Sequence, residues 1–226
     1  MIDCRKVLSD FNGPWDAEVL FVAEAPGRLG AEVTGIPLFG DRTGDRFEEL
    51  LTAMGWDRCG VFITNAVLCN PRDEWGNNDT PRRRELVNCS RWLQRTIQLV
   101  DPMLVVALGR VALEGLKLIE DHTCDLRTSA GRVFHWNNRK LGVLYHPGPR
   151  TVVHRSWKQQ VNDATKLAVA ASEFLVSSLE FHRGDPASRA PIPQLRSRVR
   201  NLNQNGSSEL DRRRGLNKAT RIGIVR

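Results

Sequence analysis

Four short, mostly apolar runs limit the folds open to this chain, because polar, proline or glycine residues stand at or soon after the end of each. The runs cover residues 18–24, 61–67, 103–108 and 140–145. Short apolar runs that end in turn-forming residues are typical of strands buried on both faces. The sequence therefore predicts a sheet whose strands lie inside the protein.

Segments with the 3.6-residue spacing of amphipathic helices separate these runs. They cover residues 47–54, 82–100, 111–120 and 157–179. Alternating strands and helices favour a parallel sheet with helices on both faces. We therefore predict a three-layer α/β/α sandwich with a mostly parallel four-stranded central sheet. Residues 133–136 are predicted to pair with 140–145 around Asn137-Asn138, and residues 221–225 to add a late strand.

The two ends of the chain differ in charge. The net charge is +7, and eleven basic and four acidic residues between 180 and 226 account for all of it. We predict one domain over residues 1–179 and a flexible, arginine-rich extension over 180–226. Such an extension attracts phosphates in a salt-dependent way. The alternative is a solvated tail without a partner.

The compartment follows from what the sequence lacks. No apolar run approaches the ~20 residues that cross a bilayer, and the first ten residues lack the apolar stretch of a signal peptide. Five cysteines are an odd number, which argues against a disulfide framework. We expect a cytoplasmic protein that does not enter a membrane and that is a monomer.

Polar and turn-forming residues follow the predicted strands directly. They are Glu24-Ala25-Pro26-Gly27, Thr64-Asn65, Gly109-Arg110 and His146-Pro147-Gly148-Pro149. Each of these elements alone is also common as a plain connection between a strand and a helix. Because ligands bind beyond the carboxyl ends of parallel strands, the four elements together predict one crevice.

The order and spacing of these elements resemble the uracil-DNA glycosylase superfamily, and within it most resemble the iron–sulfur-containing family 4 and its relatives. The similarity runs from about Cys4 to Leu175. The motifs that carry it are Ala23-Glu24-Ala25-Pro26-Gly27, Thr34-Gly35-Ile36-Pro37-Leu38-Phe39-Gly40 with Thr43-Gly44, Ile63 to Pro71, Pro81 with Glu85 and Cys89, Val105 to Gly109, and Tyr145-His146-Pro147.

The resemblance implies a monofunctional DNA glycosylase. Such an enzyme hydrolyses the N-glycosidic bond of a flipped uracil or modified pyrimidine and leaves an abasic site. Glu24 would orient water or stabilise the cationic sugar. His146 would donate a hydrogen bond to the pyrimidine O2 as negative charge develops there. No lysine stands in these motifs as a Schiff-base nucleophile, so lyase activity is not expected.

The resemblance also implies how the DNA is held. Asn65 can pair with the edge of a flipped uracil, because an amide offers both a donor and an acceptor. The remaining predicted base contacts are Ala25, Pro26, Gly27, Leu38 and Phe39, and the predicted DNA contacts are Thr43, Gly44, Arg110 and Arg150.

One position departs from the family pattern. Where the family stacks an aromatic ring on the base, this chain has Leu38, with Phe39 immediately after it. Either Phe39 stacks, or the floor of the pocket has changed and admits a larger base. The alternatives are therefore a glycosylase dedicated to a bulky modified cytosine of phage DNA, acting in antiphage defence, and a non-catalytic nucleic-acid-binding module on the same fold.

The resemblance implies a [4Fe–4S] cluster that the chemistry itself does not need. Thiolates are the soft ligands that such clusters take. Cys4, Cys69 and Cys89 match three of the four ligands, and Met1 stands where the fourth would be. Three alternatives remain open: the start codon is misassigned, another residue is the fourth ligand, or the cluster has been lost.

Overall fold

The structure is a computed structural model that describes residues 9–181. Three predictions lie outside these residues: the extension over 180–226 except for its first two positions, the late strand at 221–225, and the cluster ligand Cys4. Within residues 9–181, no helix is long and apolar enough to cross a membrane.

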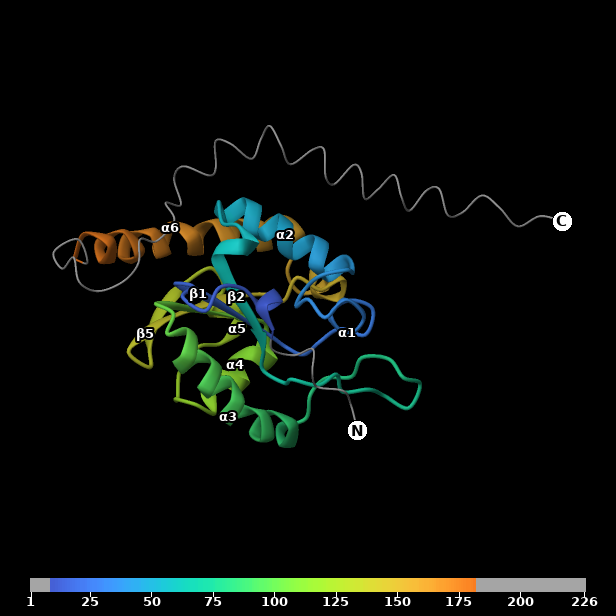
Figure 1. The fold of residues 1–226 in the computed structure, drawn as a ribbon. Coiled ribbons are helices and arrows are strands. Elements are labelled where there is room, and N and C mark those ends of the chain that lie inside the picture. Colours follow the sequence, from blue (N-terminus) through green and yellow to red (C-terminus); the bar gives the residue numbers. More distant parts are fainter. Residues whose placement is uncertain (1–8, 182–226) are drawn as a thin grey trace. The chain divides into compact units, whose positions relative to one another are not determined.

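Strands and helices alternate along the described residues, as the apolar spacing predicts (Figure 1). The strands are β1 (Val19–Ala23), β2 (Val61–Asn65), β3 (Leu104–Leu108), β4 (Val133–Trp136) and β5 (Arg139–Leu144). The α-helices are α1 (Ala31–Thr34), α2 (Arg42–Met54), α3 (Arg83–Val100), α4 (Arg110–Lys117), α5 (Leu126–Ser129) and α6 (Trp157–Phe181). Short 3₁₀ helices are η2 (Asp10–Asn12), η3 (Arg58–Gly60) and η4 (Pro149–Val153).

The strands form a single sheet in the order β2-β1-β3-β5-β4. The first four strands are parallel, and β4 is antiparallel to β5 at one edge. The predicted fold class is confirmed. The sheet has five strands rather than four, because the hairpin partner of β5 continues the same sheet.

Alternate residues of each strand pack on opposite helical layers. Leu20 and Val22 belong to a core shared with α3 and α4, whereas Val19 and Phe21 belong to a core shared with α2 and α6. Figure 1 shows α2 and α6 over one face of the sheet, with α3 and α4 over the other. Burial on both faces explains why these strands are continuously apolar.

The helix α2 begins five residues before its predicted start. The Asp41 carboxylate accepts a hydrogen bond from the Gly44 N–H at 2.9 Å, which caps the helix at this end. An N-cap carboxylate satisfies a backbone donor that the first turn leaves without a partner. The cap brings Thr43 and Gly44 into the first turn of α2.

The strand order contains one switch point. From β1 the chain moves outward to β2, then returns across β1 to form β3 and β5 on the other side. The loops that follow β1 and β3 therefore leave the sheet in opposite directions and open a crevice between them. Open α/β sheets bind their ligands at such points.

Candidate active site

A cavity of about 760 Å³ opens at this switch point. Its wall contains residues that follow β1, β3 and β5, together with residues near α5 and in η4. They are Glu24, Thr80, Gly109, Arg110, Val111, Asp125, Leu126, Arg127, Tyr145, His146, Thr151, Val153 and His154. The structure thus brings the two predicted catalytic residues, Glu24 and His146, into one cavity together with Arg110.

Glu24 is the residue immediately after β1. Its carbonyl accepts a hydrogen bond from the Val67 N–H at 3.0 Å, which ties the loop after β1 to the chain after β2. Burial raises the pKa of Glu24 above its usual value; the charge of Arg110 acts against this shift, and the charge of Glu114 adds to it. A carboxylate with a raised pKa is a stronger base than one in water.

His146 presents a defined edge of its imidazole ring. The Gly148 N–H donates to Nδ1 at 3.0 Å. Because Nδ1 accepts this bond, the proton of the neutral ring is on Nε2, which is then a donor. The loop His146-Pro147-Gly148 therefore sets the tautomer of its own histidine.

His146 is also neutral over most of the pH range. Its ring lies deep among protein atoms although part of the side chain faces the cavity, and this burial lowers the pKa of His146 to about 4. The Asp41 carboxylate opposes the shift but does not overcome it. At neutral pH the ring can donate a hydrogen bond without carrying a charge.

Gly109 lets the loops after β3 and β5 approach each other. It has a φ of +90°, and a Cβ at this position would lie 3.1 Å from the Cβ of His146. Its N–H donates to the Leu144 carbonyl at 2.8 Å. A larger residue at 109 would push His146 aside, so this glycine positions the ring.

The loop after β1 is compact. The Gly27 carbonyl accepts hydrogen bonds from the Gly30 N–H at 3.2 Å and the Glu32 N–H at 3.1 Å. A Cβ at Gly30 would lie 2.7 Å from Asp41 Oδ2, so the α2 cap sits against this loop. The predicted base contacts Ala25, Pro26 and Gly27 are half-buried here and do not line the cavity of Glu24 and His146.

Asn65 lies at the carboxyl end of β2, in register with Ala23 of β1. It is 5% exposed. Asn65 is one strand away from the walls of the cavity and is not part of them.

Leu38 and Phe39 point to different surroundings. Leu38 packs against the core shared with α2 and α6, in a left-handed conformation with a φ of +48°. Arg58 holds this turn by donating to the Pro37 carbonyl at 2.9 Å and the Leu38 carbonyl at 2.7 Å. Phe39 is 43% exposed, with the Arg58 guanidinium 5.9 Å from its ring centroid. Neither side chain lines the cavity.

The predicted DNA contacts are spread over three elements. Thr43 and Gly44 are in the first turn of α2, and Arg110 begins α4, where it pairs with Glu114 at 2.5 Å. Arg150 is exposed in η4, which follows the loop of His146. Arg46 ties α2 to that loop through a hydrogen bond to the Gly148 carbonyl at 3.3 Å.

The described cysteines that match the family pattern are Cys69 and Cys89. Both are half-buried and pack against the core shared with α3 and α4. Within residues 9–181 no group of three side chains is arranged to hold a metal ion. The part of the chain that the structure describes thus contributes two thiols of the right chemistry rather than a complete site.

Sequence reasoning missed the far wall of the cavity. Arg127 and Asp125 come from α5 and its cap, and His154 and Thr151 come from η4 or its end. No strand or glycine-rich motif precedes α5, so nothing local distinguishes Arg127 from other surface arginines. The residues of η4 follow His146 closely in the sequence. This proximity was the one available signal that they would line the same cavity.

The strand order and this cavity define an α/β protein with a cavity at the switch point of its sheet and a half-buried carboxyl group and an imidazole in the wall. The family model for the uracil DNA glycosylase superfamily matches residues 10–168. The chain belongs to this superfamily, which confirms the family predicted from the sequence.

Curated relatives agree with this membership. The chain is 32% identical over 136 residues to the type-4 uracil-DNA glycosylase of Archaeoglobus fulgidus, covering 58% of this chain and 65% of the relative. It is 27% identical over 187 residues to that of Saccharolobus solfataricus, covering 77% and 84%. It is 31% identical over 157 residues to the type-5 uracil-DNA glycosylase of Pyrobaculum aerophilum, covering 62% and 66%. The chain thus spans about two thirds of the length of the first and third of these relatives.

Proposed function

We propose that this protein is a monofunctional DNA glycosylase that hydrolyses the N-glycosidic bond of a flipped uracil or modified pyrimidine. The observation that carries the proposal is that one cavity is lined by both Glu24 and His146, the histidine whose Nδ1 accepts the Gly148 N–H. A base must leave the stack to reach such a cavity. Names of type-4 and type-5 relatives support the same reaction class.

His146 is the proposed electrostatic catalyst. When the bond between the sugar and the base breaks, the leaving pyrimidine becomes an anion with charge on O2. A neutral donor of fixed orientation stabilises that charge without first losing solvation of its own. The hydrogen bond from Gly148 and the pKa of about 4 provide both conditions for His146.

Glu24 is the proposed partner of the sugar. The same bond cleavage leaves positive charge on the sugar, which a carboxylate stabilises and which water then attacks. Glu24 would orient that water and take its proton, since burial raises the pKa of the Glu24 carboxyl. The hydroxyl group of the water bonds to the sugar and gives the abasic site. The proton of the water neutralises the base anion.

The remaining site residues position the substrate. We propose that the side-chain amide of Asn65 meets the base edge and that Ala25, Pro26 and Gly27 border the base beside the cavity wall rather than within it. Arg110 and Arg150 are proposed to contact phosphates, with Thr43 and Gly44 offering the first turn of α2. Phosphate contacts of this kind set the register of DNA without reading its sequence.

A larger base than uracil is the second candidate substrate. The cavity of about 760 Å³ falls in the range of roughly 300–1,000 Å³ that holds drug-sized ligands. Leu38 packs into the core instead of over the cavity, and Phe39 does not line it. Both observations favour a bulky modified cytosine, as in phage DNA, over a site limited to uracil.

We further propose that Cys69 and Cys89 bind an iron–sulfur cluster together with Cys4. Cys69, after β2, and Cys89, on α3, would hold the cluster and so be linked to each other through it. Purified protein is expected to contain iron and to absorb near ~400 nm. Cys89→Ser should abolish both signals, whereas Cys124→Ser, at a half-buried cysteine beside the same core, should keep them. Iron-free protein from an anaerobic preparation would contradict the cluster.

The activity is tested on oligonucleotides that carry uracil or modified cytosines, as single strands and as duplexes. Alkali then cleaves any abasic site, and the product is measured on a denaturing gel. We expect Glu24→Gln and His146→Gln to lower the rate of product formation about a hundredfold or more. No product from any substrate would leave the non-catalytic binding module as the explanation.

Two matched variants control for general damage to the protein. His135→Gln changes an exposed histidine on β4, and Glu173→Gln changes an exposed glutamate on α6. Neither residue lines the cavity, so both variants should excise the base at the wild-type rate. Equal reductions in all four variants would contradict the roles assigned to Glu24 and His146.

A further inference from the structure

The segment between β2 and α3 forms a projecting hairpin over residues 71–79. Arg72 and Asn78 form an antiparallel bridge at its base. At its tip, the Asp73 carboxylate accepts hydrogen bonds from the Trp75 N–H at 3.0 Å and the Asn77 N–H at 2.7 Å. The Gly76 N–H donates to the Asp73 carbonyl at 3.0 Å. This network gives the tip a defined conformation.

The hairpin is attached to the loop after β1. Asn78 Oδ1 accepts from the Arg28 N–H at 3.0 Å and from Asn70 Nδ2 at 3.0 Å, and Arg72 pairs with Glu32 at 2.5 Å. Thr80, just beyond the hairpin, lines the cavity of Glu24 and His146. The base of the hairpin is therefore fixed beside the candidate active site, and the tip is held at a set position relative to that base.

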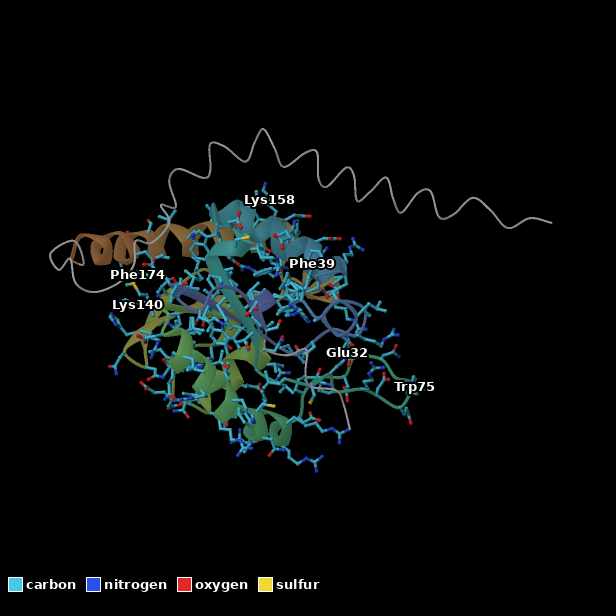
Figure 2. The ribbon with its side chains drawn as sticks, viewed as in Figure 1. Glu32, Phe39, Trp75, Lys140, Lys158 and Phe174 are labelled. Carbon is cyan, nitrogen blue, oxygen red and sulfur yellow. The ribbon has the colours of Figure 1, made fainter. Side chains whose placement is uncertain are left out.

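Trp75 occupies this tip and is 77% exposed. Figure 2 shows its side chain at the far end of the hairpin, directed away from the body of the domain. Within residues 9–181 its ring has no aromatic or cationic partner. A solvent-exposed tryptophan on an ordered turn leaves a large apolar surface in contact with water. Tryptophan residues that become buried in an interface contribute much of its binding energy.

We propose that Trp75 stacks on an unpaired base of the DNA strand, next to the nucleotide that enters the cavity. The hairpin leaves the sheet at the carboxyl end of β2, the edge where the cavity opens. The inference rests on the proposed function to the extent that this edge meets DNA. Every base has a π face, so an aromatic ring at this position binds single-stranded DNA of any sequence.

The charges around Trp75 select the base rather than the backbone as its partner. Asp73 and Glu74 precede the ring, and the nearest arginine, Arg72, is paired with Glu32. These carboxylates repel phosphates, so the tip has no means of gripping the backbone. Contact through the indole face is the interaction that remains.

Binding of the full-length chain to an unmodified single-stranded oligothymidine measures this contact. We expect Trp75→Ala to weaken binding about fivefold, which corresponds to about 1 kcal/mol. Trp75→Phe should restore most of the affinity, because it keeps a ring. The matched control is Trp92→Ala, at a 52%-exposed tryptophan on α3, which should bind like wild type.

Intrinsic fluorescence gives an independent measurement. The difference between the spectra of the wild-type chain and Trp75→Ala isolates the emission of Trp75, and stacking on a base should quench it when oligothymidine is added. Thermal unfolding of the variant should match wild type, because the replaced side chain is exposed. Unchanged affinity, unquenched emission, or a change in oligomeric state instead of DNA affinity would overturn the proposal.

The same samples separate this proposal from the proposed function. Trp75→Ala should keep base excision at saturating DNA, whereas Glu24→Gln should bind oligothymidine normally and lose excision. Excision without any effect of Trp75 on binding would overturn the stacking contact alone. A Trp75 effect on binding without excision of any base would overturn the glycosylase activity alone.

Discussion

At the scale of single residues, the chemistry of the cavity depends on which groups carry a proton. Burial shifts Glu24 and His146 toward their neutral forms, the carboxyl by raising its pKa and the imidazole by lowering its pKa. The reaction proposed above requires a charged Glu24 and a neutral His146. Arg110 favours the ionised form of Glu24, since its charge lowers the pKa of Glu24.

The acid side of the pH–rate profile should therefore follow Glu24. Excision is lost as the pH falls through the raised pKa of this carboxyl. Arg110→Gln removes the charge that lowers that pKa, so the acid limb should move to higher pH. Single-turnover rates of excision across acidic buffers measure the shift. Arg127→Gln, at another arginine of the cavity wall, should leave the limb in place, and an unmoved limb in Arg110→Gln would refute the assignment.

The pH dependence of the free energy of unfolding should reflect the low pKa of His146. In the unfolded chain this histidine takes up a proton below its usual pKa of 6.5, whereas in the folded protein its pKa is about 4. Folding stability is then lost as the pH falls from 6.5 toward 4, by up to about 3 kcal/mol. Urea unfolding of the wild-type chain and His146→Gln should show a smaller loss in the variant.

His122 provides the internal reference for that experiment. Burial also lowers the pKa of His122, but this residue is present in both proteins and its contribution cancels in the difference. Identical pH dependence of the two unfolding free energies would mean that His146 is not buried as described.

At the scale of elements, the helices matter for the site through the loops that they hold. The loop of His146 continues into η4 and then α6, and Arg155, between these two helices, donates to both carboxylate oxygens of Asp163 in α6 at 2.7 Å. The Asp163 side chain is 2% exposed. This ion pair, buried on the Asp163 side, ties the end of the loop to α6.

Breaking that pair should destabilise the fold and loosen the loop of His146. Asp163→Asn leaves the partly exposed Arg155 guanidinium without its charged partner and weakens two charge-assisted hydrogen bonds, so we expect a loss of about 1–3 kcal/mol. Thermal unfolding measures the loss. Asp121→Asn, at the exposed i, i+4 pair with Lys117, should change the midpoint little. Similar midpoints for both variants would show that the Arg155–Asp163 pair does not stabilise the fold more than an exposed pair.

At the scale of the whole molecule, charge is divided unevenly along the chain. Residues 180–226 carry the entire net charge of +7, and residues 1–179 are neutral in sum. We propose that this basic extension adds sequence-independent attraction to DNA. The slope of log K against log[salt] should become shallower by about 0.9 for each phosphate of duplex DNA that the protein no longer neutralises.

A triple substitution in the full-length chain tests the extension. Replacing Arg212, Arg213 and Arg214 with glutamine should flatten the salt dependence of duplex binding, measured by fluorescence anisotropy. The matched control replaces Lys117, Lys158 and Lys166, which are exposed on α4 and α6 and lie outside the cavity. Equal slopes for the two triple variants would contradict a specific role of the extension.

Local sequence was enough to predict the strands, the fold class and the two catalytic candidates. Val19–Ala23 is apolar throughout because both faces of β1 are buried, so its composition alone marks it as a strand. Glu24 and His146 directly follow β1 and the run that contains β5, and parallel strands bring such positions to one edge. Their meeting in one cavity was therefore predictable.

The way in which distant segments meet became visible only in the folded chain. Arg46 holds the Gly148 carbonyl across 102 residues, Arg58 turns Leu38 into the core, and Asn78 fixes the hairpin of Trp75 to the loop after β1. Arg127 joins the cavity wall without any motif around it. These placements result from side-chain contacts between segments far apart in the chain, and local periodicity contains no information about them.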